Sequence, residues 1–478
     1  MKRTDAVKIS IPGDRFTPFS LAKKLGALAV LESASFAHGK DRYSILLLDE
    51  AFRIIQDDLG ISFIINGDRK RYDQTDMVIG DKTPDILDVL LYVAEQNSVP
   101  SEGIPLPGSG IGYLSFEFCA RCDTIRIQTQ RDDLHIPESS FIVGHLYIVF
   151  DHFTETIHIF GLNYAEHEIN LEKAVKDITK RLTDLDFSYL APPAQNEACT
   201  IVTDIESSKK EYIEKVIALK KHIVAGDIVQ AVPSRRLQLK CDVEALEVYR
   251  RLRSINPSPY MFLLDFGEFQ LVGASPESLV RVREGKAAIH PIAGTRRRGK
   301  NSAEDEKLKE ELAGDPKERA EHLMLVDLAR NDLGRVCESG SVEVTSFMEA
   351  ELYSHVIHLV SEVTGKLAQN KKPIEVLRSS FPAGTVSGAP KISAIEILSG
   401  LEKTKRNFYA GSVGYVASSG DLDFCIAIRC ALKQDDLWTL QAGGGIVHAS
   451  DPEREWEETN EKLGSMRAVL EGAVLKNT

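Results

Sequence analysis

The order of strand-like and helix-like segments along the chain constrains its fold more than any other feature of the sequence. Apolar, β-branched segments cluster at residues 269–292 and again at 412–442. Segments with helical periodicity lie between these clusters, at 303–312, 317–328, 373–380 and 393–398. A doubly wound parallel sheet needs alternating strands and helices, whereas separate clusters of each kind are typical of α+β folds. We therefore expect an α+β architecture.

Single elements are predicted from periodicity and residue type. Runs of apolar and β-branched residues predict one strand each at 43–48, 141–150, 156–160, 287–292 and 424–432. The segment Ser207–Ala225 is predicted to be a helix, with one face made by Tyr212, Val216, Leu219 and Ile223. Both kinds of element therefore occur throughout the chain.

The length of 478 residues allows two or three domains. A polar stretch with Pro and Ala, from Leu190 to Ala198, is typical of a linker. We therefore divide the chain into an N-terminal region, residues 1–200, and a C-terminal region, residues 201–478.

Charge and cysteine usage narrow the possible partners. The chain has 58 Lys and Arg against 71 Asp and Glu, a net charge of −13. This charge argues against nucleic acid or an anionic membrane as a partner, but leaves room for a small anionic substrate. No apolar run approaches the ~20 residues of a membrane span, and no secretory signal is visible. The seven cysteines are scattered, so we expect reduced thiols and a cytoplasmic location, with a metal or redox role for Cys119 and Cys122 less favoured.

Two acidic pairs with helical spacing are candidate ligands for a metal ion. Glu318 and Glu321 lie three residues apart in one predicted helix, and Glu455 and Glu458 repeat the spacing near the C-terminus. Residues at i and i+3 share a helix face, so two such helices could hold one hard cation such as Mg²⁺. The alternative is that these side chains form solvated helix surfaces.

Further segments have residue types suited to an anionic ligand. Three glycines from Gly443 to Gly445 follow a predicted strand, and their N–H groups could approach a carboxylate or phosphate. Thr385 lies in a loop that leads into a helix, and Arg429 in an apolar run needs an anionic partner. A sheet bend, a turn and an internal salt bridge are the respective alternatives. Other candidates are Glu277, His358 and the arginine-rich segment 290–299.

Several long motifs occur in order between Gly226 and Lys462: PIAGTRRRG, AEHLMLVDLARNDLGRV, FPAGTVSGAPK and QAGGGIV. Together they resemble the chorismate-utilising enzyme family, and within it the anthranilate-forming branch; the resemblance covers nearly the whole chain. It implies extended antiparallel sheets packed together as a sandwich, with helices outside. It also implies a cleft for Mg²⁺ and chorismate in the C-terminal region.

The resemblance implies roles for single residues. Mg²⁺ would be bound directly by Glu321 and Glu458, and through water by Glu318 and Glu455. The metal would clamp the ring carboxylate of chorismate, which would also meet Lys462 and the backbone of Gly443, Gly444 and Gly445. The enolpyruvyl carboxylate would be held by Arg429 and Tyr409.

Catalytic roles follow from the same resemblance. Glu277 corresponds to the acid that helps the C4 hydroxyl leave. His358 and Thr385 would line the reacting ring, with His358 handling the proton in the elimination step.

Two positions distinguish branches of the family. Gln230 stands where water-adding members place a Lys base; Gln cannot deprotonate water, whereas ammonia is already a nucleophile. Ala293 stands where aminodeoxychorismate synthases commonly carry a nucleophilic Lys. Both positions favour conversion of chorismate and ammonia to anthranilate and pyruvate, the first committed step of tryptophan biosynthesis. The alternatives are aminodeoxychorismate synthase component I, of the 4-aminobenzoate pathway, and a catalytically silent tryptophan-binding subunit.

The segments Leu31–Ala34 and Asn256–Phe262 resemble a tryptophan feedback site. Glu32 would face the ligand ammonium and Ser33 would hydrogen-bond it. The indole would lie against Met261 and its neighbours Pro259, Tyr260 and Phe262, and the pocket would be completed by Tyr415, Asp423 and Cys425. No cysteine lies in the G-x-C-x-G elbow of a glutamine amidotransferase. The resemblance therefore implies a separate glutamine amidotransferase subunit, in a hetero-oligomer such as a heterotetramer.

Overall fold

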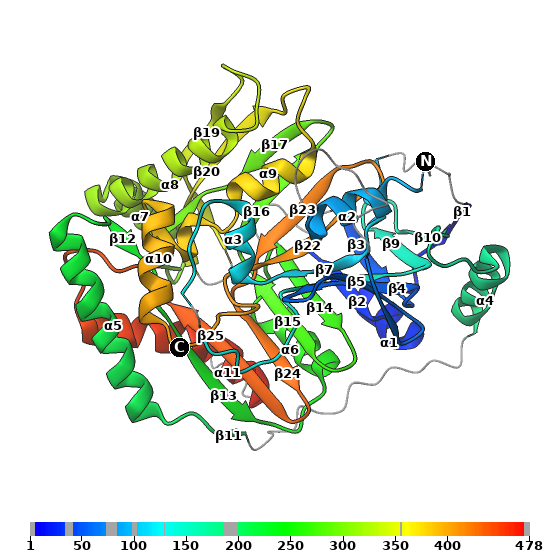
Figure 1. Ribbon diagram of the computed structural model, residues 1–478, viewed down its shortest axis with the longest axis horizontal. Helices are drawn as coiled ribbons and strands as arrows, with labels where there is room; N and C mark the ends of the chain where they lie inside the picture. Colours follow the sequence, from blue (N-terminus) through cyan, green and yellow to red (C-terminus); the bar gives the residue numbers. More distant parts are fainter. Residues whose placement is uncertain are drawn as a thin grey trace.

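Two large antiparallel sheets form the centre of the molecule (Figure 1). The computed structural model describes residues 5–33, 42–72, 84–97, 103–128, 130–184, 199–353 and 356–472. The predicted linker at 190–198, and Ala34 of the predicted feedback site, lie outside these ranges.

The first sheet has the strand order β1-β10-β9-β3-β2-β14-β15-β24-β25-β13-β11. Its strands from the N-terminal region are β1 (Ala6–Pro12), β2 (Ala29–Glu32), β3 (Tyr43–Leu47), β9 (Leu146–Asp151), β10 (Thr156–Leu162) and β11 (Thr200–Ile201). Those from the C-terminal region are β13 (Ser234–Lys240), β14 (Tyr260–Asp265), β15 (Gln270–Ser275), β24 (Cys430–Gln434) and β25 (Leu437–Gly443).

The second sheet has the strand order β18-β20-β17-β16-β23-β22-β7-β8-β4-β5-β6, with β19 (Glu343–Leu352) paired to β20. Its N-terminal strands are β4 (Phe52–Asp57), β5 (Gly60–Ile65), β6 (Asp68–Arg71), β7 (Ile111–Leu114) and β8 (Ser139–Val143). Its other strands are β16 (Ser278–Arg283), β17 (Lys286–Ile289), β18 (Ile292–Arg297), β20 (Val356–Lys366), β22 (Ser412–Val416) and β23 (Leu422–Ile426). A separate two-stranded ladder joins β12 (Gln230–Ala231) to β21 (Gly388–Ala389).

Helices cover the outer faces and ends of the sheets, and α5, α7, α8 and α10 gather at one end (Figure 1). The longer helices are α4 (Leu171–Thr183), α5 (Ile205–Ala225), α6 (Ala245–Ile255), α7 (Ser302–Gly314), α8 (Pro316–Gly334), α10 (Lys391–Leu401) and α11 (Pro452–Leu470). The shorter ones are α1 (Pro18–Leu25), α2 (Ile86–Ala94), α3 (Cys119–Cys122), α9 (Pro373–Ser380) and the 3₁₀ turns η2 (Phe116–Phe118) and η3 (Gly384–Val386). Among the helices described, none is long and apolar enough to cross a membrane.

The main apolar core lies between the two sheets. One continuous cluster joins Phe262 and Tyr147 of the first sheet to Phe141 and Phe424 of the second. A second cluster packs α1, α4, α6 and α11 on the other face of the first sheet. Burial of apolar surface therefore holds the sheets together as a sandwich with helices outside, and this confirms the expected fold class. Strands from both sides of residue 200 occur in each large sheet, and the division of the chain at that point stays a prediction.

Two segments expected to be single strands are each divided between the sheets. The prediction of one strand at 141–150 is wrong, because β8 lies in the second sheet and β9 in the first. The chain crosses at Gly144, where a methyl group would lie 2.6 Å from the carbonyl oxygen of Asp49. The run 424–432 is likewise divided into β23 and β24, with Arg429 between them at a positive φ of 52°. Both runs are continuously apolar because both strands of each pair are buried.

The segment 287–292 is also not one strand. β17 ends at Ile289, and β18 begins at Ile292, after Pro291. Proline has no backbone N–H to donate to a ladder, so it interrupts the strand there.

The expectation of reduced thiols throughout is wrong at one pair, because Cys199 and Cys241 form a disulfide. The pairing of β11 with β13 places Thr200 opposite Lys240, so the next residues outward on the two strands are also opposite one another. Their Cα atoms are 4.6 Å apart, within the range that a disulfide spans. The remaining five cysteines are free thiols, and burial raises the pKa of both Cys119 and Cys122, which does not favour reactive thiolates.

Candidate active site

Helices α8 and α11 carry the two predicted acidic pairs. Each helix begins with an aspartate N-cap followed by proline, Asp315 before Pro316 and Asp451 before Pro452. The cap carboxylates accept hydrogen bonds from the first free backbone N–H groups, which fixes where each helix begins. All four predicted metal-binding glutamates therefore lie in the first two turns of these helices.

Glu321 on α8 and Glu458 on α11 lie in one electrostatic neighbourhood. Burial raises the pKa of Glu321, and the charges of Glu318 and Glu458 raise it further against the opposing effect of Lys317. Glu458 Oε1 is also 2.7 Å from Nζ of Lys462, one helical turn along α11. The two residues expected to bind Mg²⁺ directly therefore lie on different helices, close enough for their charges to interact.

Glu455 has one carboxylate oxygen that the described residues do not satisfy. Its Oε2 atom is buried and has no hydrogen-bond partner among them. Burial raises the pKa of this carboxyl, and the charge of Glu458 adds to the effect. Buried unsatisfied acceptors are rare in proteins and call for an unseen ion, water or ligand.

Glu318, expected to bind the metal through water, forms an ion pair, and its role at the metal stays a prediction. Its Oε1 atom lies 3.1 Å from Nη1 of Arg296, whose Nη2 atom lies 2.9 Å from Asp315. The side chain therefore already has a cationic partner, whereas Glu455 forms no salt bridge with the residues that the structure describes.

Among the residues that the structure describes, no group of three or more His, Cys, Asp or Glu side chains is gathered as a metal site. Mg²⁺ often takes only one or two protein carboxylates, because water and substrate oxygens fill its other positions. Glu321, Glu458 and the unsatisfied Oε2 of Glu455 fit that requirement. Mg²⁺ binding stays a prediction.

The glycine loop after β25 lies against these acidic residues. A methyl group on Gly444 would lie 3.1 Å from Glu455 Oε2 and 3.2 Å from the hydroxyl of Tyr212. Lys462 Nζ donates a hydrogen bond to the carbonyl oxygen of Gly443 at 2.8 Å. The loop thus combines an open backbone with a lysine charge, the arrangement expected for a carboxylate site.

Gln230 meets the same loop from the β12–β21 ladder. It pairs with Ala389, and a methyl group on Gly445 would lie 2.6 Å from Gln230 Nε2. The Oε1 atom of Gln230 is buried and has no partner within the described part of the chain. The amide therefore offers a hydrogen-bond acceptor beside the loop and no basic amine.

Glu277, the residue before β16, is hydrogen-bonded to Thr385 in the 3₁₀ turn η3. Thr385 Oγ1 donates a hydrogen bond to Glu277 Oε1 at 2.9 Å. Burial raises the pKa of Glu277 to about 8, although Thr385 and Arg429 act in the opposite direction. The carboxyl is therefore mostly protonated at neutral pH, as a proton donor must be.

His358 on β20 has a defined tautomer. Its Nδ1 atom lies 2.8 Å from the carbonyl oxygen of Gly294 and must donate to it. Burial lowers the pKa of the imidazole, and the charge of Arg429 lowers it further. The neutral ring then carries its lone pair on Nε2, which can accept a proton.

Arg429 and Tyr409 are the expected pair for the enolpyruvyl carboxylate. Burial lowers the pKa of Arg429, and its guanidinium forms no salt bridge recorded for the described residues. Burial raises the pKa of Tyr409 to about 12, so its hydroxyl stays protonated. A methyl group on Gly443 would lie 3.2 Å from this hydroxyl. Among the described residues, the internal salt bridge considered for Arg429 is not found, although the charges of Glu458 and Glu277 act on its guanidinium.

Arg406 is a supporting residue that sequence reasoning missed. It is 1% exposed, and its guanidinium donates to the carbonyl oxygens of Val386 and Val232 at 2.8 and 2.6 Å. Its Nε atom lies 2.7 Å from Glu402 Oε2, at i,i+4 spacing. The i,i+4 spacing of Glu402 and Arg406 is the sequence pattern from which this ion pair could have been predicted. Arg406 ties the Thr385 loop to the segment that carries Gln230.

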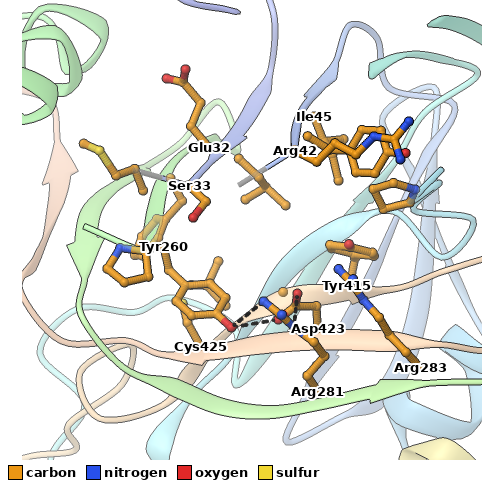
Figure 2. Close-up of a pocket in the computed structure, with 18 of the residues that line it drawn as sticks. Glu32, Ser33, Arg42, Ile45, Tyr260, Arg281, Arg283, Tyr415, Asp423 and Cys425 are labelled. Atoms are coloured by element: carbon orange, nitrogen blue, oxygen red, sulfur yellow. Dashed lines mark hydrogen bonds and ion pairs between the residues drawn. The ribbon is translucent and has the colours of Figure 1, made fainter. Parts of the chain in front are cut away.

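A cavity of about 310 Å³ lies between the sheets (Figure 2). All nine residues predicted for the feedback site line it. Asp423 accepts hydrogen bonds from Arg281 Nε at 3.0 Å and from the Tyr260 hydroxyl at 3.1 Å. Sequence reasoning missed Arg42, Tyr43, Ile45, Arg281 and Arg283, which join the lining through strand pairing rather than through a local motif.

Glu32 is oriented differently from the expectation. Its carboxylate points away from the Asp423 side of the cavity (Figure 2). Arg253 Nε lies 2.8 Å from Glu32 Oε2, and the Tyr249 hydroxyl donates to the same oxygen at 2.6 Å. Glu32 is thus paired with Arg253 rather than turned toward a ligand ammonium.

The cavity and Glu277 are connected through β23. Cys425, which lines the cavity, pairs with Ser278 of β16. The next residue, Ile426, donates its backbone N–H to the carbonyl oxygen of Glu277 at 3.1 Å. One strand therefore contacts both sites.

The paired antiparallel sheets, and the acidic residues of α8 and α11 beside a glycine loop, agree with the resemblance to enzymes that act on chorismate. A family described as chorismate binding enzyme matches residues 62–468. The chain belongs to this family, as the sequence resemblance predicted.

Individual relatives point to one branch. The chain is 51% identical to anthranilate synthase component 1 of Spirochaeta aurantia over 454 residues, 95% of this chain and 93% of that protein. It is 37% identical to the Aquifex aeolicus protein of the same name, over 96% of this chain and 93% of that protein. The crystal structure of anthranilate synthase component I from Streptococcus pneumoniae superposes with a TM-score of 0.76 at 34% identity, covering 89% of this chain and 92% of that one. The menaquinone-specific isochorismate synthase of Escherichia coli, at 19% identity and a TM-score of 0.72, covers 98% of this chain and 95% of its own and shares the fold.

Proposed function

We propose that this chain converts chorismate and ammonia to anthranilate and pyruvate, as the first step committed to tryptophan. The relatives named anthranilate synthase component 1 support this assignment. The observation that carries the chemistry is the buried Glu277, whose pKa near 8 supplies a proton where a hydroxyl must leave.

The substrate is held by its two carboxylates. Arg429 and Tyr409 bind the enolpyruvyl carboxylate, because the guanidinium forms no salt bridge with the described residues and the phenol remains a donor. Lys462 and the backbone of the glycine loop bind the ring carboxylate. Mg²⁺, held by Glu321 and Glu458 with Glu455 assisting, would supply positive charge to that carboxylate.

Two proton transfers follow from the side chains. Glu277 protonates the C4 hydroxyl as it leaves, and Thr385 keeps the carboxyl turned toward the ring. Ammonia adds at C2 with no base at Gln230. His358 Nε2 then removes the C2 proton while the C3–O bond breaks and enolpyruvate leaves, because the Nδ1 proton of His358 is donated to Gly294. The enolpyruvate takes up a proton at its methylene carbon and becomes pyruvate.

Aminodeoxychorismate synthase component I is the second candidate. Ala293 lies on β18 opposite Leu359 and has no nucleophilic atom with which to form a covalent intermediate. This favours anthranilate over the 4-aminobenzoate precursor.

Ammonia would come from glutamine through a separate glutamine amidotransferase subunit. The relatives' name, component 1, implies a second component. A heterotetramer and a cytoplasmic location belong to the same proposal. We also assign the cavity of Figure 2 to feedback inhibition by L-tryptophan, because its lining combines apolar walls with paired charges.

The test is incubation of the purified chain with chorismate, Mg²⁺ and ammonium at pH 8, followed by anthranilate fluorescence and product mass. The expected product is anthranilate, and tryptophan is expected to suppress it. Glutamine alone is expected to support no turnover. A product with the mass of aminodeoxychorismate, or no product, would reject the assignment.

A further inference from the structure

Tyr212 on α5 is a buried tyrosine with an unsatisfied hydroxyl. Its side chain is 0% exposed and packs in a small cluster with Ile446 and Trp456. The two aromatic rings are 6.1 Å apart. The hydroxyl has no hydrogen-bond partner within the described ranges. A phenylalanine would fill this site without the cost of burying a hydroxyl, so the oxygen calls for a partner.

Glu455 supplies an unsatisfied acceptor beside this donor. The Tyr212 hydroxyl and Glu455 Oε2 lie 3.2 and 3.1 Å from the position that a methyl group on Gly444 would occupy. Glu458 Oε1 lies 3.9 Å from the same position. Because residue 444 is glycine, no side chain from the loop occupies the position that both atoms approach. They form no direct bond, but a single water molecule can bridge them.

Electrostatics assigns the direction of that bridge. A tyrosine hydroxyl has an ordinary pKa of about 10, so it is protonated at neutral pH. The phenol therefore keeps its proton and acts as the donor. The carboxylate has no proton to offer when it is ionised, so it acts as the acceptor.

We propose that Tyr212 is a positioning residue for the acidic site, whose hydroxyl holds Glu455 through one bridging water beside Gly444. Held in this way, Glu455 directs its carboxylate toward Glu458 and the predicted metal. The role rests on the proposed function, because it gives the metal site a supporting residue. Partners of this kind typically change metal affinity ~10- to 100-fold when they are removed.

The test compares Tyr212→Phe with the native chain. The substitution keeps the ring, and the midpoint of thermal unfolding is expected to stay the same or rise. Affinity for Mn²⁺, measured without chorismate by electron paramagnetic resonance, is expected to fall about tenfold. The Mg²⁺ concentration that half-saturates turnover is expected to rise by the same factor, with little change in kcat at saturating Mg²⁺.

Tyr164→Phe is the matched control. Tyr164 is also 0% exposed with an unsatisfied hydroxyl, but it packs against Phe52 at a ring distance of 5.3 Å. This variant is expected to bind Mn²⁺ as the native chain does. Equal losses in both variants would show a general packing effect and overturn the proposal.

A double-mutant cycle with Glu455→Gln tests whether Tyr212 acts through Glu455. If it does, Tyr212→Phe causes no further loss of Mn²⁺ affinity in the Glu455→Gln background. Fully additive losses, or native affinity in Tyr212→Phe, would overturn the proposal. Because Mn²⁺ binding is measured without substrate, failure of the proposed reaction would be seen separately, as absence of anthranilate from the native chain.

Discussion

Glu277→Gln removes the proposed proton donor with little change in size. The amide oxygen of the replacement can still accept from Thr385 Oγ1, so the loop is expected to keep its position. A positioned general acid contributes ~10²- to 10⁴-fold to rate. We therefore expect kcat with ammonia to fall by about that factor, while KM for chorismate changes little. Anthranilate fluorescence under saturating Mg²⁺ and ammonium measures both constants.

The same substitution has a pH-dependent effect on stability. Burial raises the pKa of Glu277 from its ordinary 4.5 to about 8. The folded state thus favours the neutral carboxyl, so its contribution to stability is complete below pH 4.5 and is lost as pH rises toward 8. A difference of 8 − 4.5 = 3.5 in pKa corresponds to about 5 kcal/mol. At pH 9 the Gln variant is therefore expected to be more stable than the native chain, and at pH 4 nearly equal.

The dependence of turnover on pH tests the proton-donor role of Glu277 most directly. Turnover of the native chain is expected to fall above about pH 8, as Glu277 loses its proton. Thr385 lowers the pKa of Glu277 by hydrogen-bonding its carboxylate, so Thr385→Val should move this alkaline limb to higher pH. A limb that moves to lower pH, or a Glu277→Gln variant with native kcat, would refute the reasoning.

Three further predictions concern the metal, the cavity and the disulfide. Glu321→Ala is expected to raise the Mg²⁺ requirement at least about tenfold, whereas Glu453→Ala, on the exposed side of α11, is not; Mg²⁺ titration of turnover distinguishes them. Ser33→Ala is expected to weaken tryptophan inhibition about fivefold, the effect of losing one hydrogen bond, measured as the inhibition constant. Cys199→Ser is expected to lower the free energy of unfolding by about 4 kcal/mol, since Cys199 and Cys241 close a loop of 42 residues. Denaturant unfolding with and without reductant checks this value, and an unchanged midpoint would contradict it.

The sequence predicted elements best where local signals mark their ends. The helix at Pro373–Ser380 has the predicted bounds. Proline at the first helical position is compatible with only one helix start, which explains the accuracy at Pro373. The acidic pairs also fell on helices as predicted, because i,i+3 spacing is itself a local property.

Features that depend on non-local pairing could not be predicted. The chain changes sheet at Gly144 and near Arg429, but each apolar run is continuous because both strands in it are buried. The Cys199–Cys241 disulfide follows from the register of two strands that lie 42 residues apart in sequence. No local pattern encodes that register.

Side-chain orientation was the other limit. Glu32 was placed correctly on the cavity wall, but its pairing with Arg253 follows from the packing of α6 beside β2. Tyr212 was predicted only as part of an apolar helix face. A role for its hydroxyl follows only from the folded structure, in which the hydroxyl lies near Gly444 and Glu455.

Strand β23 contacts both the cavity and Glu277, the proposed proton donor. If a ligand displaces Cys425, we expect strain in the hydrogen bond from the Ile426 N–H to the backbone carbonyl oxygen of Glu277. The free energy of this strain would affect both binding equilibria equally, because coupling between two binding equilibria is reciprocal. If tryptophan weakens chorismate binding by a given factor, chorismate must weaken tryptophan binding by the same factor. The concentration of chorismate would then determine how much tryptophan is needed to inhibit the synthesis of tryptophan.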